Sequence, residues 1–478
     1  MNAAQRFEAY LTHLAEGLGH ADRHAGLRGY CTGLMLPLER KSIEPIAASV
    51  DPLHVSARHQ SLHHFVAKSE WSDDEMLRRI RAWITPKLGL AAGGFWIVDD
   101  TGFPKKGKHS VGVARQYCGA LGKQDNCQVA VSVSLASRTA SLPVSWQRYL
   151  PKEWVQDRTR RQKAGVPDDI VFATKPQMAL QHLKRLLDEG LPPYCVLADA
   201  GYGVDTAFRM GLSQMGLPYM VDITSAVSVW PPDVEPLPPK AYRGRGRPAV
   251  QPRRTAKRRP LSVKALAQAL PEAAYQTVRW REGTNQMLSC RFAAVRVRHA
   301  GGNVGRARLW PQQWLLIEWP QDQAAPEKCY ISTLPETCSL NALVDVAHQR
   351  WRIERDDQEL KQEFGLDHYE GRGWRGFHHH ASLSIAAYGF LLAERLTGHK
   401  PGSQKTVFDA KRLPHPKITC RAAQRRAQRH VPDSIPTLRQ QRTGPLLRHS
   451  KSNHPQAKPG DLLCWSSETG TPSPPPSR

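Results

Sequence analysis

The sequence has no apolar segment long enough to cross a bilayer. A membrane-spanning helix needs about 20 consecutive apolar residues, and the best candidate, residues 382–392, is too short. The first residues, MNAAQRFEAYLTHLAEG, are polar and mixed in charge, so no secretory signal is expected. These absences predict a cytoplasmic protein that does not enter a membrane.

Cysteines are few and dispersed. Nine occur in 478 residues, and no two form a CxxC pair. An odd number without clustering argues against both a complete disulfide framework and a clustered zinc site. We therefore expect Cys118, Cys127 and Cys195 to act as small buried apolar residues in a reducing compartment.

Acidic residues are scarce relative to basic ones. The chain has 43 Asp and Glu against 67 Lys and Arg, a net charge of +24, and the basic residues recur along its whole length. Such a balance predicts a polyanionic partner. Residues 227–260 are rich in proline and include YRGRGRPAVQPRRTAKRRP, which has no acidic residue, so this part is expected to be a loop or linker.

Periodic apolar residues divide the rest into helical and strand-like parts. Before residue 90 the pattern is helical, with Met76, Ile80 and Ile84 following an N-cap at Ser72. After it, the short apolar runs FWIV, VAVSVSLA and YCVLA predict strands, with a helix at about 177–187 between the last two. Strands that feed helices predict an α/β core.

A second group of strand-like runs, YQTVRWRE, LSCRFAAVRVR and QWLLIEW, predicts a β-rich insertion before the helical pattern returns at about Leu340. The Pro- and Ser-rich end predicts disorder. The expected parts are an all-helical N-terminal domain (1–90), the first part of the core (91–225), the basic loop and insertion (226–338), the C-terminal helices of the core (339–396) and a basic, disordered tail (397–478).

Two predicted strands end in aspartate. FWIV stops at Asp99 and Asp100, and YCVLA stops at Asp199. Ligands of open α/β sheets lie at the carboxyl ends of the strands, so these carboxylates are candidates for a site. An aspartate after a strand is also a common helix cap or turn former, and this alternative stays open.

A third carboxylate lies in the helical segment RWRIERDDQELKQEF. At about 100° per residue, Arg350, Glu354 and Lys361 fall within roughly 40° of one another, beside an apolar stripe. Asp357 lies close to the same arc and competes with Glu354. A solvated face of surface ion pairs is the alternative interpretation. Three carboxylates from separate elements suit phosphoryl transfer by two Mg²⁺ ions about 4 Å apart.

Three segments, in this order, carry a family resemblance: DDTGFPKKGKHSVGVARQYCGALGKQDNCQ, LADAGYG and RWRIERDDQELKQEFGLDHYEGR. Together they resemble the DDE transposases of bacterial insertion sequences, in the IS-four-like group and its IS-seven-oh-one-like branch. The resemblance covers about residues 58–396. It implies a ribonuclease H-like mixed-sheet core whose β-rich insertion separates the second and third acids.

The resemblance assigns roles residue by residue. The metal-binding acids match Asp100, with Asp99 as the alternative, then Asp199 and Glu354. The family signature of tyrosine, arginine, glutamate and lysine is matched at Arg350, Glu354 and Lys361, which gives Arg350 and Lys361 a role at the DNA. Ala347 stands at the tyrosine position, so that hydroxyl is missing or replaced by a neighbour such as His348.

The implied activity is cleavage of DNA at the ends of an insertion sequence, followed by strand transfer into target DNA. The implied cofactor is a pair of Mg²⁺ ions, for which Mn²⁺ can substitute. The implied partners are double-stranded DNA, as terminal inverted repeats and as target, and a second copy of the chain, in the bacterial cytoplasm at the nucleoid. The resemblance gives the helical N-terminal domain (1–90) the role of binding the inverted repeats. The alternatives are an inactive DNA-binding relative and a ribonuclease H-like nuclease without transposition.

Further groups are candidates for DNA contact. Lys105, Lys106 and Lys108 follow the first acids, where they are expected to bind phosphates without reading sequence. Arg245 and Arg247 in RGRGRP could enter a minor groove, bind phosphate or lie in an inert linker. The family's insertion resembles one that presents an aromatic residue to a flipped base; Trp280 is that candidate, with a buried core position as the alternative.

Residues 378–380, HHH, point to different sides of a helix, so phosphate contact or exposure is expected there rather than a metal.

Overall fold

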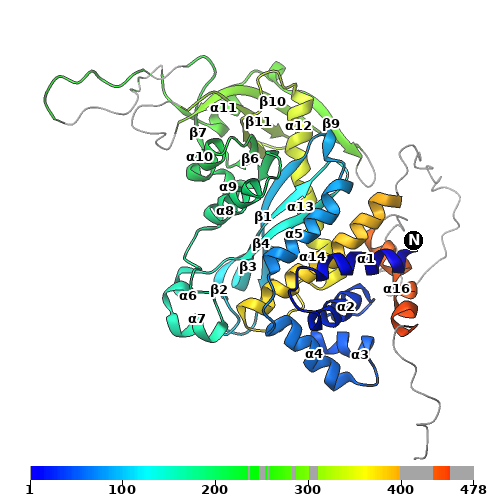
Figure 1. Cartoon of the computed structure of the whole chain (residues 1–478). Helices are drawn as coiled ribbons and strands as arrows, with labels where there is room; N and C mark the ends of the chain where they lie inside the picture. The colour runs from blue at the N-terminus through cyan, green and yellow to red at the C-terminus, as the bar shows by residue number, and fades with distance from the viewer. Residues whose placement is uncertain are drawn as a thin grey trace, which may run out of the picture.

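The computed structural model of the chain describes residues 2–234, 237–246, 253, 255, 258–282, 287–300, 310–398 and 434–452. In this described part, twelve strands form one mixed sheet with helices packed against it. The N-terminal helices lie at one end of the molecule and the inserted strands at the other (Figure 1). The predicted fold class, a ribonuclease H-like core with a β-rich insertion and a helical N-terminal region, is confirmed.

Five strands in the order β4–β3–β1–β5–β6 form the core of the sheet. On one side β1 pairs antiparallel with β3, which pairs antiparallel with β4. On the other side β1 pairs parallel with β5, which pairs parallel with β6. This is the ribonuclease H-like arrangement. The core strands are β1 (Phe95–Pro104), β3 (Lys123–Ala136), β4 (Ser141–Arg148), β5 (Cys195–Ala198) and β6 (Tyr219–Ile223).

A short hairpin lengthens one end of β3. β2 (Ala114–Cys118) pairs with the first residues of β3, and the turn between them contains η3 (Gly119–Leu121). Cys118 and Cys127 are buried in this hairpin and Cys195 is half-buried at the start of β5, and all three are free thiols, in keeping with the prediction from their spacing.

Helices connect the core strands. α8 begins at a capping box, in which Thr174 accepts the backbone N–H of Gln177 and Gln177 accepts that of Thr174. The connecting helices are α6 (Lys152–Gln156), α7 (Arg158–Ala164), α8 (Lys175–Asp188), α9 (Ala200–Gly203) and α10 (Thr206–Gln214).

The N-terminal helices share one hydrophobic cluster with the core, so this region has no separate interior. The Tyr10 hydroxyl donates to the carbonyl of Ala386 at 3.0 Å, and Arg6 pairs with Glu394 at 2.6 Å. The elements are α1 (Ala3–Ala15), α2 (Asp22–Met35), α3 (Ile43–Val50), α4 (Val55–Ala67), α5 (Asp73–Ile84), η1 (Thr85–Lys87) and η2 (Leu90–Ala92).

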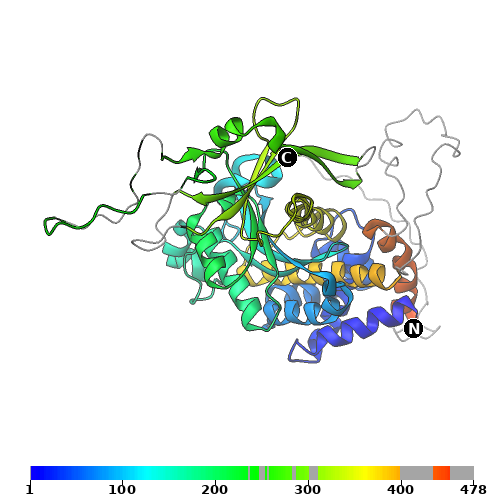
Figure 2. The ribbon, with the colours of Figure 1, turned by 90° about the horizontal axis from the view of Figure 1, so that it is seen from above.

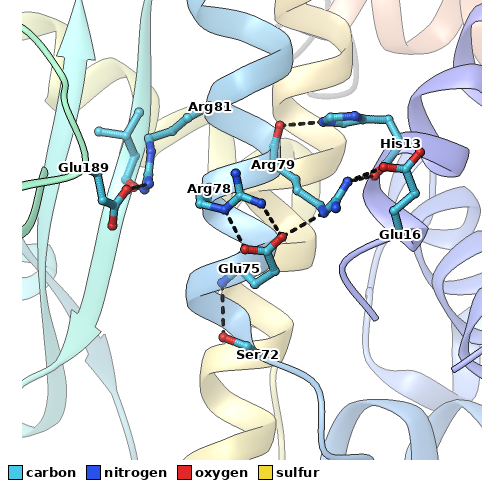
Figure 3. A network of polar contacts seen from close by, with 9 residues as sticks. His13, Glu16, Ser72, Glu75, Arg78, Arg79, Arg81 and Glu189 are labelled. Atoms are coloured by element: carbon cyan, nitrogen blue, oxygen red, sulfur yellow. Dashed lines mark hydrogen bonds and ion pairs between the residues drawn. The ribbon is translucent and has the colours of Figure 1, made fainter. Parts of the chain in front are cut away.

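Helix α5 joins this region to the sheet (Figure 3). It begins where predicted, because the Ser72 hydroxyl accepts the backbone N–H of Glu75 at 3.1 Å. On one side Arg79 bridges Glu75 and Glu16 at 2.9 and 2.7 Å. On the other, the buried Arg81 pairs with Glu189 and donates to the carbonyl of Val144 on β4 at 2.8 Å.

The insertion continues the core sheet instead of forming a sheet of its own. Its last strand pairs antiparallel with β6, so that Met220 lies opposite Ser332. Seen from above, its strands run on from the core strands (Figure 2). The elements are β7 (Ser228–Trp230), β8 (Leu261–Ser262), α11 (Val263–Ala269), η4 (Glu272–Ala274), β9 (Gln276–Glu282), β10 (Met287–His299), β11 (Gln313–Trp319) and β12 (Lys328–Ser332).

Helices complete the chain, and the last of them corrects one prediction. They are α12 (Leu340–Ala347), η5 (His348–Arg350), α13 (Trp351–Phe364), α14 (Trp374–Gly398) and α16 (Ile435–Ser452). The prediction of a disordered tail over 397–478 is wrong for residues 435–452. There Arg439 pairs with Glu363 of α13 at 2.8 Å and Thr443 donates to the carbonyl of Met35 at 3.2 Å. The other residues after 398 lie outside the described part.

The prediction for the three adjacent histidines of α14 is also wrong. His378, His379 and His380 are all buried, and burial lowers the pKa of each to about 4. Each ring bonds to backbone, including the carbonyls of Trp374 and Gly365. They are packing residues, because α14 is covered on all sides by the sheet and the N-terminal helices. Among the described helices, none is long and apolar enough to cross a membrane.

Candidate active site

Three neighbouring parallel strands bring aspartates to one end of the sheet. Val98 of β1 lies opposite Ala198 of β5, and Ala198 lies opposite Val221 of β6. The next residue in each segment is an aspartate: Asp99, Asp199 and Asp222. These carboxylates therefore form a row where the parallel pairing of β1, β5 and β6 ends, while β1 continues to Pro104 against β3 alone. This is the end of a parallel sheet at which α/β proteins bind ligands.

Asp99 and Asp100 serve different faces of β1, because successive strand residues alternate in direction. Phe95 and Ile97 pack in the same cluster as Ile353 of α13, so the odd-numbered residues face that helix. Asp99 continues this face, and its Oδ2 lies 3.2 Å from Nη1 of Arg350. Asp100 instead pairs with Lys175 at the start of α8, at 2.9 Å. The other carboxylate oxygen of Asp99, Oδ1, accepts the backbone N–H of Asp100 at 2.8 Å.

Arg350 connects the strand-end aspartates to α13. Besides Asp99, its guanidinium reaches Glu354 at 2.6 Å and Asp222 at 4.0 Å. It also acts on the neighbouring Asp199, whose pKa it lowers. Its side chain is only 17% exposed, whereas that of Glu354 is 57% exposed. One half-buried cation thus lies among acids from two strands, the start of α9 and a helix.

Burial raises the pKa values of the aspartates in this row. The pKa of Asp222 rises to about 6 because burial outweighs the lowering effects of Arg350 and Lys328. Burial raises the pKa of Asp99 and of Asp199 as well, again against Arg350. The raised values follow mainly from burial, which disfavours the charged form of each carboxyl group.

Asp199 also caps a helix, as the alternative interpretation of a strand-end aspartate allows. Its Oδ1 accepts the backbone N–H of Tyr202 at 3.3 Å, at the start of the short helix α9. The cap fixes the side chain at the strand end and leaves its other oxygen uninvolved in the cap. Capping and a place in the acid row are therefore compatible.

The rest of this face of α13 lies along β1. Lys361 donates to the carbonyl of Gly102 at 3.1 Å, and its ammonium lies 5.2 Å from the centre of the Phe103 ring. Asp357 lies one helical turn before Lys361 on the same helix. Burial raises its pKa to about 6, while Lys361 and Thr101 lower it. Asp357 thus faces β1 beside the acid row, and the competition with Glu354 for the third position stays open.

The loop after β1 separates the three predicted phosphate-binding lysines. Lys106 and Lys108 are exposed. Lys105 is half-buried, donates to the carbonyl of Tyr369 at 3.0 Å and has a pKa lowered by burial. The geometry therefore leaves Lys106 and Lys108 as surface cations, while Lys105 holds the loop in place.

The other predicted DNA-binding residues lie in or near the insertion. Arg245 is exposed, and Arg247 lies outside the described residues. Trp280 is half-buried: its ring stacks on His348 at 4.2 Å and 7° and meets Phe292 edge-on. His348, two residues before Arg350, thus covers one face of the Trp280 ring. Ala347, at the tyrosine position of the family signature, is buried in the same cluster.

Sequence reasoning missed two members of the site. Asp222 follows the apolar run YMV just as the other aspartates follow theirs, and this repeated pattern could have revealed it. No sequence pattern pointed to Lys175. A lysine in the first turn of a helix interacts unfavourably with the helix dipole, so its presence there has no local explanation. Its position is explained only by Asp100, which the fold brings to it.

The carboxylates suit a hard divalent cation, since Mg²⁺ prefers oxygen ligands. Among the residues that the structure describes, however, no three acidic, histidine or cysteine side chains already converge as a metal site. Arg350 lies among the acids instead.

The chain matches known proteins in two comparisons. The family model described as DDE superfamily endonuclease matches residues 13–287. The chain is also 34% identical over 194 residues to the "Probable transposase for insertion sequence element IS701" of Microchaete diplosiphon. That alignment covers 40% of this chain and 47% of the relative, so the chain spans about half the length of the curated protein it matches.

Proposed function

Because the chain belongs to the DDE superfamily endonucleases, we propose that it is a DNA transposase that cuts the ends of an insertion sequence and joins them to target DNA. The observation that carries the proposal is the meeting of strand-end aspartates with Glu354 at the guanidinium of Arg350. The name of the relative, a transposase, supports the same activity.

The acids proposed to hold two Mg²⁺ ions, or Mn²⁺ in their place, are Asp99, Asp199 and Glu354. The geometry favours Asp99 over Asp100, the residue matched by family resemblance, because Asp99 faces α13. The ions would activate the attacking hydroxyl and stabilise the leaving oxygen.

The basic residues around this site are proposed to bind DNA. Lys106 and Lys108 project from the loop after β1 and are proposed to bind the phosphate backbone. Arg350 and Lys361 lie at the acids and are proposed to orient the cut phosphate and offset its charge. Arg245 and Arg247 are proposed as further phosphate contacts, and Trp280 as a neighbour of the strand end. The proposed assembly is a homodimer on double-stranded DNA.

The test compares Glu354→Gln with the unmodified protein and with Glu336→Gln as a matched control. Glu336 is also an exposed acid paired with an arginine, Arg296 at 3.0 Å, but it lies outside the acid row. Each protein is tested for binding to a duplex carrying an element end, and for cleavage with and without Mg²⁺.

Glu354→Gln is expected to abolish cleavage and to keep or strengthen DNA binding, because a negative charge facing phosphate is lost. The control is expected to cleave normally. If Glu354→Gln cleaves at the unmodified rate, Glu354 is not the third acid and Asp357 is tested next. Cleavage without strand transfer would indicate a nuclease, and binding without cleavage by the unmodified protein would indicate an inactive relative.

A further inference from the structure

Arg350 occupies an unusual position for a residue that is meant to hold DNA. Its guanidinium contacts Asp99 at 3.2 Å and Glu354 at 2.6 Å and lies 4.0 Å from Asp222. With 17% of the side chain exposed, it is turned toward the acids more than toward solvent. Both terminal nitrogens of the guanidinium therefore already donate hydrogen bonds to carboxylates in the absence of DNA.

The acids bind this guanidinium strongly. Burial lowers the pKa of Arg350, but Asp99, Asp222, Glu354 and Asp199 raise it by more, so the net shift is upward. The guanidinium lies among four carboxylates, because Asp199 stands between Asp99 and Asp222 in the row and Glu354 reaches the same group from α13. A single positive charge therefore holds the row together without neutralising it.

A second arginine on α13 provides a contrast. Arg355 also pairs with the acid four residues later, Glu359, at 2.7 Å. Its side chain is 48% exposed, and no strand-end aspartate takes part in that pair. The i,i+4 pairing is common to both arginines, and what distinguishes Arg350 is the convergence of acids from other elements.

We infer that Arg350 is the resident countercation of the acid row, and that the acids exchange its guanidinium for a divalent ion when the metal binds. The inference rests on the proposed function. A divalent ion offers twice the charge to the same oxygens. Once exchanged, the guanidinium is free to pair with a DNA phosphate, for which its planar fork is well matched.

This exchange couples two binding events through one side chain. Metal binding costs the energy of releasing Arg350 from the acids, so affinity for metal is lower than the acids alone would give. In return, the released guanidinium strengthens DNA binding, and by linkage DNA strengthens metal binding by the same factor.

The first measurement is Mn²⁺ binding without DNA, by electron paramagnetic resonance of the free ion. The proteins are unmodified, Arg350→Gln, Arg355→Gln and Asp199→Asn. Arg350→Gln is expected to bind Mn²⁺ about 10-fold more tightly, because no cation has to be released. Arg355→Gln is expected to match the unmodified protein. Equal or weaker Mn²⁺ binding by Arg350→Gln overturns the inference.

The second measurement is the affinity for a short DNA duplex with and without Ca²⁺, by fluorescence anisotropy. Ca²⁺ should strengthen DNA binding by the unmodified protein and by Arg355→Gln. The gain should be lost in Arg350→Gln, which has no guanidinium to release. A gain of the same size in Arg350→Gln contradicts the coupling.

Folding and function are controlled separately. If Arg350→Gln does not fold without metal, Arg350→Lys is used: it keeps the charge but not the fork, and is expected to bind Mn²⁺ more tightly by a smaller factor. Unchanged Mn²⁺ binding by Arg350→Lys would then overturn the inference. If Asp199→Asn binds Mn²⁺ like the unmodified protein, the proposed active site itself is wrong. If Asp199→Asn loses Mn²⁺ while Arg350 variants match the unmodified protein, only the countercation inference fails.

Discussion

Helix α13 has acids on two faces, and the two faces hold them by different means. On the face toward the strand ends, Glu354 and Asp99 share the guanidinium of Arg350. On the opposite face, Asp356 is 1% exposed and accepts hydrogen bonds only from neutral hydroxyls. The donors are Ser141 and Tyr388 at 2.8 Å and Ser134 at 3.3 Å.

The difference separates an anchor from a working site. Hydroxyls of β3, β4 and α14 reach Asp356 from fixed positions, so this carboxylate fastens the helix to the sheet and to its neighbour. The guanidinium of Arg350, on a long stem, is instead proposed to be exchangeable, and Glu354 beside it is 57% exposed. Changes on the Asp356 face should lower stability, and changes on the face toward the strand ends should lower activity.

The largest effect is expected from the strand-end aspartates. Asp99→Asn removes an acid on the α13 face and should lower metal-dependent DNA cleavage by about 100-fold or more, with little loss of stability. Asp100→Asn breaks the pair with Lys175 and should lower cleavage less. Single-turnover cleavage rates and urea unfolding of both variants provide the comparison. The reverse order of rates would make Asp100 the first acid.

On the anchoring face, Asp356→Ala should lower the free energy of unfolding by about 3 kcal/mol, because three buried hydroxyls lose their acceptor. The measurement is urea unfolding monitored by tryptophan fluorescence. Cleavage per folded molecule should change much less than in Asp99→Asn. A variant of normal stability would show that the hydroxyl network does not anchor α13.

Stability should also depend on pH through the same residue. Burial raises the pKa of Asp356 to about 7, while Ser141 and Tyr388 lower it. An unfolded aspartate titrates near 3.9, so the folded state binds more protons between about pH 4 and pH 7. Stability should therefore fall as pH rises through this window, by up to about 1.4 kcal/mol per pH unit for this group.

The check is the free energy of unfolding between pH 4 and pH 8 without divalent ions. Asp356→Asn cannot titrate at this position, so the free energy of unfolding of the unmodified protein minus that of the variant should fall as pH rises from 4 to 7. Asp222 and Asp357, with pKa values raised to about 6 by burial, should leave a residual slope below that pH. Identical profiles for the two proteins would exclude Asp356 as the titrating group.

The smallest effect is expected from one donor of the network. Ser141→Ala removes a single hydrogen bond at 2.8 Å and leaves Asp356 two others, so it should cost about 1 kcal/mol of stability. Cleavage rate and Mn²⁺ affinity should not change. A loss of cleavage as large as that of Asp99→Asn would mean that the two faces of α13 are not separable.

Local patterns explain what the sequence could predict. The apolar runs that precede Asp99 and Asp199 are strands, and the stripe containing Ile353 and Leu360 is the buried side of a helix, because such periodicities depend only on neighbouring residues. Serine at position 72 begins a helix for an equally local reason. The three strand-like runs of the insertion are also strands.

Contacts between distant residues explain what it could not predict. Asp99 and Asp100 must face opposite sides of β1, but only the packing of Ile353 decides which side is the site. The pairing of β6 with β12 joins segments more than a hundred residues apart, and no local pattern encodes it. The burial of His379 likewise depends on Val66 and Trp71, whose carbonyls its ring contacts.

The contact between Arg350 and Asp99 joins residues 251 positions apart. A ribosome that adds about 5–20 residues per second needs roughly 10 to 50 s to pass from one to the other. During that time the nascent chain can carry its strand-end aspartates and a positively charged surface, yet it lacks the helix that completes the acid row. A chain released early could bind DNA but not cut it. The order of synthesis itself thus delays nuclease activity until almost the whole core exists.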